Sequence, residues 1–313
     1  MSPRPAPGQP SPLSPALLTD RYELTMLAAA SSDRPDTLVL GRISDDPQVD
    51  VARLKPVLDL VVPKLAAAGI VRGEILLARD PVQMRNYLRR GRVDWVTETA
   101  AMAAMLGADA KAKPIVRAMR ENEGAYHSVF FVRRDSGIET LDQLPGKLLA
   151  LQSRSSTSAF YLPLLMLKEK GLTLVELASP DDLPMPGQVG FALARTELNI
   201  AAWVEKGLVD VGAFSNTDWD NPEHMPESFR SHMRVIARTA DVPRAVELVR
   251  ADLPPPLQQA LTQALLGLGD DVAADSALRK YFGTTRFVAL DAVHLGTLQQ
   301  LGQAVLSLRR EVE

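Results

Sequence analysis

The chain has 313 residues, of which 35 are Lys or Arg and 38 are Asp or Glu, so its formal net charge is −3. This balance provides no basic face for a phosphate backbone, and nucleic acid is not expected as a partner. Because the chain has no Cys and only 4 His, none paired at helical metal-ligand spacing, we expect no metal site, no thiolate chemistry and no cofactor. No apolar run reaches the roughly eighteen residues that a membrane span requires.

The first 35 residues differ in composition from the rest. Residues 1–15 are rich in Pro and Ser, which is typical of a disordered segment. The next stretch ends in small residues like a signal peptide, but Asp20, Arg21 and Glu23 interrupt its apolar core, so it is not a convincing signal. Residues 17–26, LLTDRYELTM, resemble the opening of nicotinate phosphoribosyltransferases. We interpret residues 1–35 as a disordered or leader segment; an ordinary amphipathic helix is the alternative.

From Thr37 onward, short β-rich apolar runs alternate with helical patterns. Gly69 ends the first helical pattern, and Pro81 opens the second. This alternation predicts an α/β unit with a largely parallel sheet. The expected strands are 37–43, 73–80, 93–97, 112–119 and 125–134, and the expected helices are 51–69, 81–91 and 99–106.

A second α/β unit is predicted from about Asp135. Two stretches, YLRRGRVDWVTETAAM and WVEKGLVDVGAFSNTDW, share the order helix, basic residue, Gly, Val-Asp, strand and polar loop. Open α/β sheets bind ligands at the polar loops that follow the carboxyl ends of strands. The similarity therefore indicates either two lobes with a ligand in the cleft or two βα units of one sheet. The expected strands are 148–152, 173–177, 209–214 and 233–240, the expected helices are 140–147, 158–172 and 196–207, and the tail from 254 is expected to be helical.

Four hydroxyl residues lie in a row between a predicted strand and a predicted helix. Ser155, Ser156, Thr157 and Ser158 supply the N-cap and the first turn of that helix. A helix N-terminus leaves backbone N–H groups unpaired and carries a partial positive charge, so hydroxyl donors around it make a seat for an oxyanion. Simple N-capping is the alternative, but it needs only one Ser or Thr. The surplus of hydroxyls favours the oxyanion seat.

An ordered set of spaced motifs resembles the phosphate-, phosphite- and phosphonate-binding proteins of ABC transporters. The motifs are Gly-x-Val-Asp, Gly-x-Tyr-x-Ser, DSGI, Leu-x-x-Leu-x-Gly-Lys and Ser-Thr-Ser with a Pro five residues beyond, and the similarity covers roughly residues 37–290. The resemblance implies a bilobal α/β protein of the type II periplasmic-binding-protein fold, with two α/β lobes joined by a two-crossing hinge. Lobe 1 would hold residues 36–132 and 236–313, and lobe 2 would hold residues 133–235, with crossings near Arg133 and Ala237.

The resemblance also assigns a ligand site in the interlobe cleft. The hydroxyl row would hold the oxyanion, Tyr126 would contact it from the other lobe, and polar loops from both lobes would close over it. An acidic residue in the last loop accepts a hydrogen bond from a protonated ligand oxygen in the family, and Asn216 or Asp218 could fill that role. The implied ligand-binding residues are Ser156, Thr157, Ser158, Tyr126, Thr97, Glu98, Thr99, Ser215, Asn216 and Asp218.

Three features depart from the family pattern, the first being that the loop GRISDDPQVD lacks the usual aromatic residue. The family often has a His before the helix that leads to the second Gly-x-Val-Asp, whereas this chain has Arg195, Thr196 and Glu197 in that region. Arg195 could bind the anion as a bidentate fork, or it could be a solvated residue at a helix start. Glu98 is unexpected in an anion cleft; it would point away or pair with an amino group of the ligand.

These observations predict a periplasmic or extracytoplasmic solute-binding protein rather than an enzyme. Its partners would be a small phosphorus oxyanion (phosphonate, phosphite or phosphate) and an ABC-transporter permease. One alternative is an enzyme of the same fold acting on a phosphorylated metabolite, with Glu98 or Glu197 as its acid or base. The other alternative is a ligand-sensing domain of a signalling system.

Overall fold

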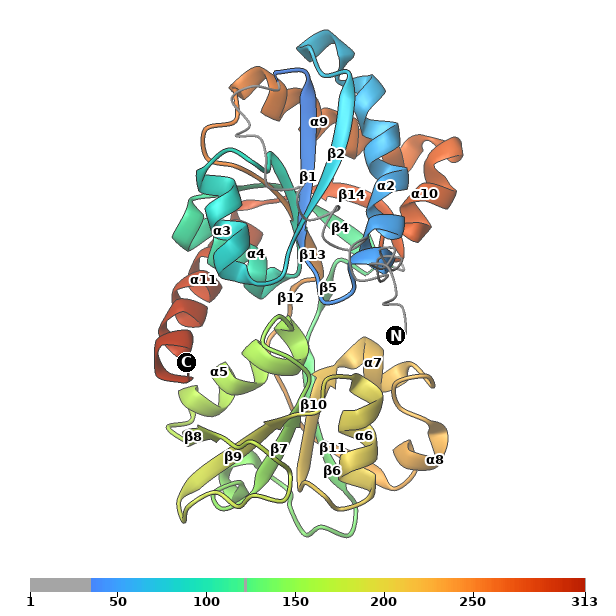
Figure 1. Ribbon diagram of the computed structural model, residues 1–313. Helices are drawn as coiled ribbons and strands as arrows, with labels where there is room; N and C mark the ends of the chain where they lie inside the picture. Colours follow the sequence, from blue (N-terminus) through green and yellow to red (C-terminus); the bar gives the residue numbers. More distant parts are fainter. Residues whose placement is uncertain (1–34, 121–122, 313) are drawn as a thin grey trace, which may run out of the picture.

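The computed structural model describes residues 35–120 and 123–312 and contains two six-stranded sheets with helices packed on both (Figure 1). The prediction for residues 1–35, including the resemblance at 17–26, lies outside the described residues except for Pro35. The bilobal α/β fold expected from the motifs is therefore confirmed. The two Gly-x-Val-Asp stretches lie in different sheets, so the two-lobe interpretation of their similarity is the correct one.

The first lobe is built on a sheet with the strand order β14-β4-β13-β3-β1-β2. Its strands are β1 (Thr37–Ile43), β2 (Arg72–Ala78), β3 (Trp95–Glu98), β4 (Lys113–Arg120), β13 (Ala245–Val249) and β14 (Thr284–Ala289). Its helices are α2 (Pro47–Lys64), α3 (Pro81–Arg89), α4 (Ala100–Ala110), α9 (Pro255–Leu266), α10 (Asp275–Lys280) and α11 (Ala292–Val312), with short 3₁₀ turns η3 (Ala66–Ala68), η6 (Gly267–Asp270) and η7 (Val272–Ala274). Gly69 follows η3 in the left-handed region, at φ 87°, as its expected role as a helix terminator requires.

The second lobe is built on a sheet with the strand order β11-β6-β10-β7-β9-β8. Its strands are β6 (Ser128–Arg133), β7 (Leu148–Leu151), β8 (Thr173–Glu176), β9 (Gln188–Leu193), β10 (Val211–Ser215) and β11 (Met233–Arg238). Its helices are α5 (Leu162–Glu169), α6 (Glu197–Glu205), α7 (Asn216–Asp220) and α8 (Glu227–Arg230), with the 3₁₀ turn η4 (Leu141–Gln143) and the π-helical turn η5 (Thr157–Tyr161).

The connection between the lobes differs from the expected one. Residues 125–134 do not form one strand: β5 (Ala125–Tyr126) pairs with β12 (Val242–Pro243) between the lobes, and β6 begins after His127 in the second sheet. The positions expected for the crossings, Arg133 and Ala237, lie inside the second sheet, where β6 pairs with β11. An alternating apolar pattern continues through His127, so the sequence cannot show that the chain changes sheets there.

Besides the short strand β12, three strands were missed by pattern reasoning, and two of them change the first sheet. β13 and β14 return from the tail and run antiparallel to β4, so the first sheet is mixed rather than largely parallel. β13 is buried along its whole length although it contains Glu247. One charged residue in a run of five lowers the mean hydropathy, so this core strand could not be identified from its apolar residues. The third strand, β9, lies in the second sheet beside β7, directly after the Pro-rich loop.

The Val-Asp repeat has the same structural role in both lobes. Asp94 donates its backbone N–H to the carbonyl of Val39 at 3.0 Å, and its carboxylate accepts the N–H of Val39 at 2.9 Å. Asp210 makes the same pair of bonds with Leu148, at 2.9 and 3.0 Å. The carboxylate therefore joins the start of β3 to β1 in the first lobe and the start of β10 to β7 in the second.

The two aspartates should differ in their contribution to stability. Asp94 also binds Arg250 at 2.8 Å with both side chains largely buried, whereas Asp210 binds the more exposed Lys147 at 3.3 Å. We expect Asp94→Asn to lower the free energy of unfolding by about 2 kcal/mol, because a buried charged hydrogen bond is lost, and Asp210→Asn to lower it by less than about 1 kcal/mol. Urea unfolding of both variants measures the difference; equal losses would contradict it.

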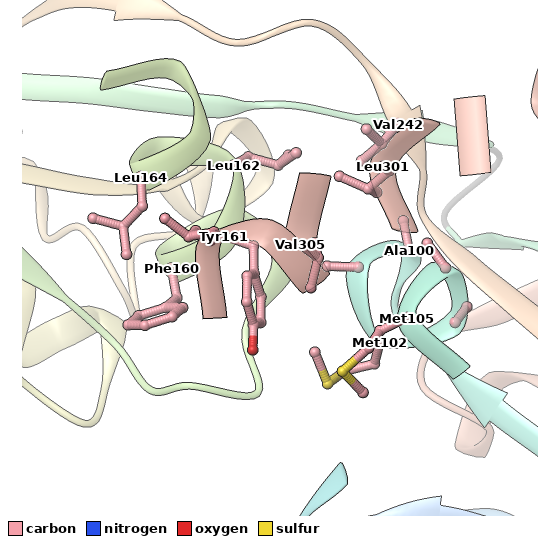
Figure 2. Close-up of a cluster of buried hydrophobic side chains, with 14 of the residues drawn as sticks. Ala100, Met102, Met105, Phe160, Tyr161, Leu162, Leu164, Val242, Leu301 and Val305 are labelled. Carbon is pink, nitrogen blue, oxygen red and sulfur yellow. The ribbon is translucent and has the colours of Figure 1, made fainter. Parts of the chain in front are cut away.

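An apolar cluster joins the lobes beside the cleft (Figure 2). It combines α4, the segment from η5 into α5, β12 and α11. The α11 helix packs along α4 and ends beside α5, where Lys168 and Glu311 form an ion pair (Figure 1). The labelled side chains in Figure 2 are Ala100, Met102, Met105, Phe160, Tyr161, Leu162, Leu164, Val242, Leu301 and Val305.

Candidate functional site

A polar cavity of about 360 Å³ lies where the carboxyl ends of β1, β3 and β4 face those of β7, β9 and β10. This is the position that strand topology favours for ligands in open α/β sheets. Most of the residues expected at the site line this one cavity, although they come from five separate segments of the chain. They are Glu98, Thr99, Tyr126, Ser156, Thr157, Ser158, Arg195 and Asp218.

The hydroxyl row is where the lobes touch. Ser156 caps η5, its Oγ accepting the N–H of Ala159 at 3.0 Å. Thr157 is buried, and its Oγ1 accepts the N–H of Ala101 and donates to Oγ1 of Thr99, both at 2.9 Å and both from the first lobe. Within the hydroxyl row, Ser156 therefore caps the helical turn and Thr157 connects the two lobes.

The first turn after the hydroxyl row is irregular. η5 is a turn of π-helix in which Ala159 has non-helical angles, φ −109° and ψ 20°, before the chain continues as α5. Such turns are frequent at functional sites because they open the regular hydrogen-bond ladder. The carbonyl of Ser158 is held by the Ser128 hydroxyl at 2.6 Å, which attaches this turn to β6.

Tyr126 lies against an arginine that sequence reasoning missed. The guanidinium of Arg244 is 4.6 Å from the centre of the Tyr126 ring, and both residues line the cavity. Arg244 makes no side-chain hydrogen bond or ion pair with any described residue. Burial raises the pKa of Tyr126, while Arg244 and a hydrogen bond with Thr157 oppose that rise.

Two more arginines enter the cavity from the first lobe. Arg42, near the end of β1, pairs with Asp50 at 3.3 Å. Arg120 ends β4, and within the described part of the chain its guanidinium has no hydrogen bond or ion pair. Burial, with Arg244 and Arg42 nearby, lowers the pKa of Arg120 to about 9. In the sequence, Arg42 and Arg120 each lie at or near the carboxyl end of a predicted strand, and this position was the signal that could have indicated a role in the site.

The acidic residues of the cavity are individually satisfied. Glu98 does not extend toward a ligand amine: its Oε1 accepts the N–H of Ile43 at 2.7 Å, and burial raises its pKa. Burial alone would raise the pKa of Asp218, but hydrogen bonds from His224, at 2.7 Å, and Ser215 lower it overall. Burial, together with Asp218, raises the pKa of Glu197.

Three residues expected at the site do not line the cavity. Thr97 points to the opposite face of β3 from Glu98, and its Oγ1 donates to Glu247 at 2.8 Å. Ser215 caps α7, and Oδ1 of Asn216 accepts the N–H of His127 at 3.1 Å. Of the two candidates for the acidic acceptor, only Asp218 lines the cavity.

Arg195 lines the cavity with its backbone in the left-handed region, at φ 72°. Its N–H donates to the carbonyl of Gln152 at 3.0 Å, which connects β9 to the loop after β7. A non-glycine residue in this region costs of the order of 1 kcal/mol, and such residues cluster at functional sites. Its side chain is exposed, which is compatible both with binding of an anion and with a solvated residue at a helix start.

Glu247 lies behind the cavity as a fully buried carboxyl group. It accepts hydrogen bonds from Trp95 Nε1 at 2.6 Å, Thr97 Oγ1 at 2.8 Å and the Tyr281 hydroxyl at 3.0 Å. Burial raises its pKa to about 7, while these donors and the charge of Arg120 oppose the rise.

This raised pKa predicts a pH dependence of stability. Because the folded-state pKa of Glu247 exceeds its ordinary value of 4.5, its contribution to stability is fully present below about pH 4.5 and is lost as the pH rises to about 7. Relative to wild type, Glu247→Gln should therefore gain up to about 3 kcal/mol of unfolding free energy between pH 4.5 and pH 8. Urea unfolding at several pH values measures this difference, and a constant difference would contradict it.

Two facing sheets with a polar cavity between their strand ends define a two-lobed ligand-binding protein. The chain belongs to the family described as ABC transporter, phosphonate, periplasmic substrate-binding protein, whose family model matches residues 43–295. The resemblance seen in the sequence motifs is therefore confirmed. The chain is accordingly a solute-binding protein by family.

Solved structures with the same fold include two of one bacterial protein. XAC2383 from Xanthomonas citri, in a structure bound to chloride ion, is 48% identical, covers 88% of this chain and 100% of its own, and superposes with a TM-score of 0.85. In a structure bound to ATP, the same protein is 47% identical, covers 89% of this chain and 100% of its own, and superposes with a TM-score of 0.85. PhnD1 from Prochlorococcus marinus in complex with methylphosphonate is 16% identical, covers 89% of this chain and 100% of its own, and has a TM-score of 0.63, so that likeness concerns the fold alone.

Residues 35–120 and 123–312 contain neither a candidate membrane span nor a candidate metal centre. No helix there is long and apolar enough to cross a bilayer. In the same residues, no group of three His, Asp or Glu side chains is arranged to hold a metal ion.

Proposed function

We propose that the cavity captures a phosphorus oxyanion, as a phosphonate, phosphite or phosphate group, for uptake by an ABC-transporter permease. The observation that carries the proposal is one cavity lined both by the hydroxyl row Ser156–Ser158 and by Arg120 and Arg244. Neither guanidinium has a carboxylate partner among the described residues, and a part-buried arginine without one is poised for an external anion.

Asp218 supports selection by protonation state. Its lowered pKa keeps it a carboxylate at neutral pH, and a carboxylate can only accept a hydrogen bond. A monoprotonated phosphonate or phosphate offers such a proton, whereas a fully deprotonated anion would be repelled. The ligand group is therefore proposed to bind as its monoanion.

The organic part of the ligand is a separate matter. A cavity of about 360 Å³ has the liquid volume of about a dozen waters, which exceeds one tetrahedral oxyanion. A protein 47% identical to this chain has been seen with ATP, whose phosphates present the same oxyanion chemistry. We therefore include phosphate esters among the candidate ligands.

Transport function implies movement of the lobes about the β5–β12 ladder. We propose lobe 1 as residues 35–120, 123–124 and 244–312 and lobe 2 as residues 128–239, with the ladder as the hinge. Ligand would favour the closed arrangement, in which Thr157 contacts Thr99, because it binds groups from both lobes at once. A periplasmic or extracytoplasmic location follows from the same family role.

Calorimetry and thermal shift with phosphate, phosphite, methylphosphonate, aminoethylphosphonate and ATP test the proposal. Binding of at least one of them, weakened by Arg244→Met, is expected. A folded sample that responds to none would overturn the proposed function. Turnover of a bound phosphate ester in single-turnover assays, lost in Glu98→Ala or Glu197→Ala, would instead support an enzyme on this fold.

A further inference from the structure

Three arginines of the first lobe surround one aromatic ring. The guanidinium carbons of Arg42, Arg53 and Arg120 lie 4.2, 5.4 and 5.2 Å from the centre of the Phe282 ring. All three arginines line the cavity. A guanidinium over a ring face is stabilised by about 0.5–1 kcal/mol at exposed sites and more where water is excluded.

The ring is held by an unusual backbone. Phe282 has φ 53°, in the left-handed region, between Tyr281 and Gly283, and a bulky residue rarely adopts this conformation. Tyr281 is fully buried and stacks edge-on against Phe282, with ring centres 5.5 Å apart. The turn between α10 and β14 therefore fixes the position of the ring, although Phe282 itself adopts an unfavourable backbone conformation.

Carboxylates neutralise this group only in part. Asp50 is 3.3 Å from Arg42 and 4.0 Å from Arg53, and Glu247 and Glu98 interact with Arg120 and Arg42 from behind and beside the cavity. Arg120 has no ion pair in the described residues, and its Nε has no hydrogen-bond partner. Asp45 and Asp46 also line the cavity, but among the described residues neither forms an ion pair with these arginines. Three guanidinium groups held on one ring, with a single carboxylate within 4.0 Å, are therefore suited to attract a further anion.

This group is separate from the seat for the first oxyanion. The hydroxyl row contacts Thr99 and Tyr126, and Tyr126 carries its own arginine, Arg244. The Phe282 ring carries the other arginines, which reach the same cavity from β1, α2 and β4. The cavity thus has two cationic centres, each organised by an aromatic ring.

We infer that the Phe282 ring and Arg42, Arg53 and Arg120 form a second anion subsite, so that the ligand carries at least two anionic groups, as a di- or triphosphate does. This inference rests on the proposed function, because the first group must bind at the hydroxyl row. Phe282 acts as a positioning residue that gathers the three guanidinium groups around one ring. A ligand with one phosphorus oxyanion would occupy only the first seat.

Calorimetry with phosphate, pyrophosphate and tripolyphosphate at constant ionic strength tests the subsite. For the wild type, tripolyphosphate is expected to bind about 10- to 100-fold more tightly than phosphate, the gain of one charged hydrogen-bonded contact. Phe282→Leu should reduce this ratio to near one without changing the affinity for phosphate, and Phe282→Tyr, which keeps the ring, should retain it.

A second pair of variants covers the case in which Phe282→Leu does not fold. Arg53 is half exposed, so Arg53→Gln should fold, and it should lower the tripolyphosphate-to-phosphate ratio several-fold. Arg72→Gln removes the same charge at the amino-terminal end of β2, outside the cavity, and should leave the ratio unchanged.

The outcomes separate the subsite from the proposed function. Tight binding of phosphate with no preference for longer chains, or a preference unaffected by Phe282→Leu and Arg53→Gln, overturns the second subsite alone. An equal loss for all three anions in Phe282→Leu overturns it as well, because the ring would then serve the first seat. Failure of the wild type to bind phosphate, methylphosphonate or either polyphosphate overturns both.

Discussion

Replacing Arg120 with methionine is expected to stabilise the unliganded protein and to weaken ligand binding at least about 30-fold. Burial and the neighbouring Arg244 and Arg42 lower the pKa of Arg120 to about 9, which means that its charge is unfavourable before an anion arrives. A methionine of similar length removes that charge, and we expect a gain of about 1 kcal/mol in the free energy of unfolding. Binding is lost because the same charge contributes to the anion site.

Calorimetry with tripolyphosphate, which would reach both anion seats, and urea unfolding without ligand measure the two effects. Arg117→Met is the matched control: Arg117 is also on β4, but its Nη1 donates to the carbonyl of Gly124 and it does not line the cavity. The control should leave the affinity unchanged. If Arg120→Met were less stable and bound ligand normally, Arg120 would be a structural residue rather than part of the anion site.

Replacing Glu247 with leucine is expected to lower the free energy of unfolding by about 3–5 kcal/mol at neutral pH. Three donors, from Trp95, Thr97 and Tyr281, point at this carboxyl group, and leucine would leave all of them buried without an acceptor. Leucine also removes the nearest compensation for the charge of Arg120, since Glu247 interacts with it through the protein interior.

Urea unfolding with an unchanged slope measures this loss. Glu247→Gln keeps the volume and one acceptor oxygen, so its loss should be clearly smaller. Equal stability of Glu247→Leu and wild type would show that the three donors find other partners, and the role given to Glu247 would then be wrong.

The local features of the site were predictable because their signals are local. A strand followed by surplus hydroxyls and a helix is readable within about fifteen residues, and Ser156 does cap the helical turn at the cavity. The two Val-Asp motifs were readable as a repeat because each performs the same short-range task, with Val39 in one lobe and Leu148 in the other. The sequence did not show which side of β3 each residue faces. Thr97 and Glu98 were both expected at the ligand site, although they lie on opposite sides of this strand.

The cationic part of the site was not predictable in the same way. Arg42, Arg120, Arg244 and Phe282 lie on four distant segments. Apart from the positions of Arg42 and Arg120 near the ends of predicted strands, nothing in the sequence distinguishes them from surface residues or an ordinary core aromatic. Their convergence depends on β13 and β14 returning to the first sheet beside β4, and those strands were missed. Each of the two strands is short, and one contains a buried charge, so hydropathy could not identify them.

Four features could be deduced from the sequence alone: the α/β alternation, the repeat that makes two lobes, the hydroxyl row at a helix start and the family that these motifs indicate. Each of these features depends on residues that are close together in the sequence, because backbone preferences and the spacing of apolar residues act over short distances along the chain. The three-dimensional structure was needed to show where the chain changes sheets, which polar residues face the cavity and which arginines have no carboxylate partner among the described residues. Those properties depend on contacts between segments far apart in the sequence, such as that between Arg42 and Phe282, and local physical preferences do not specify such contacts.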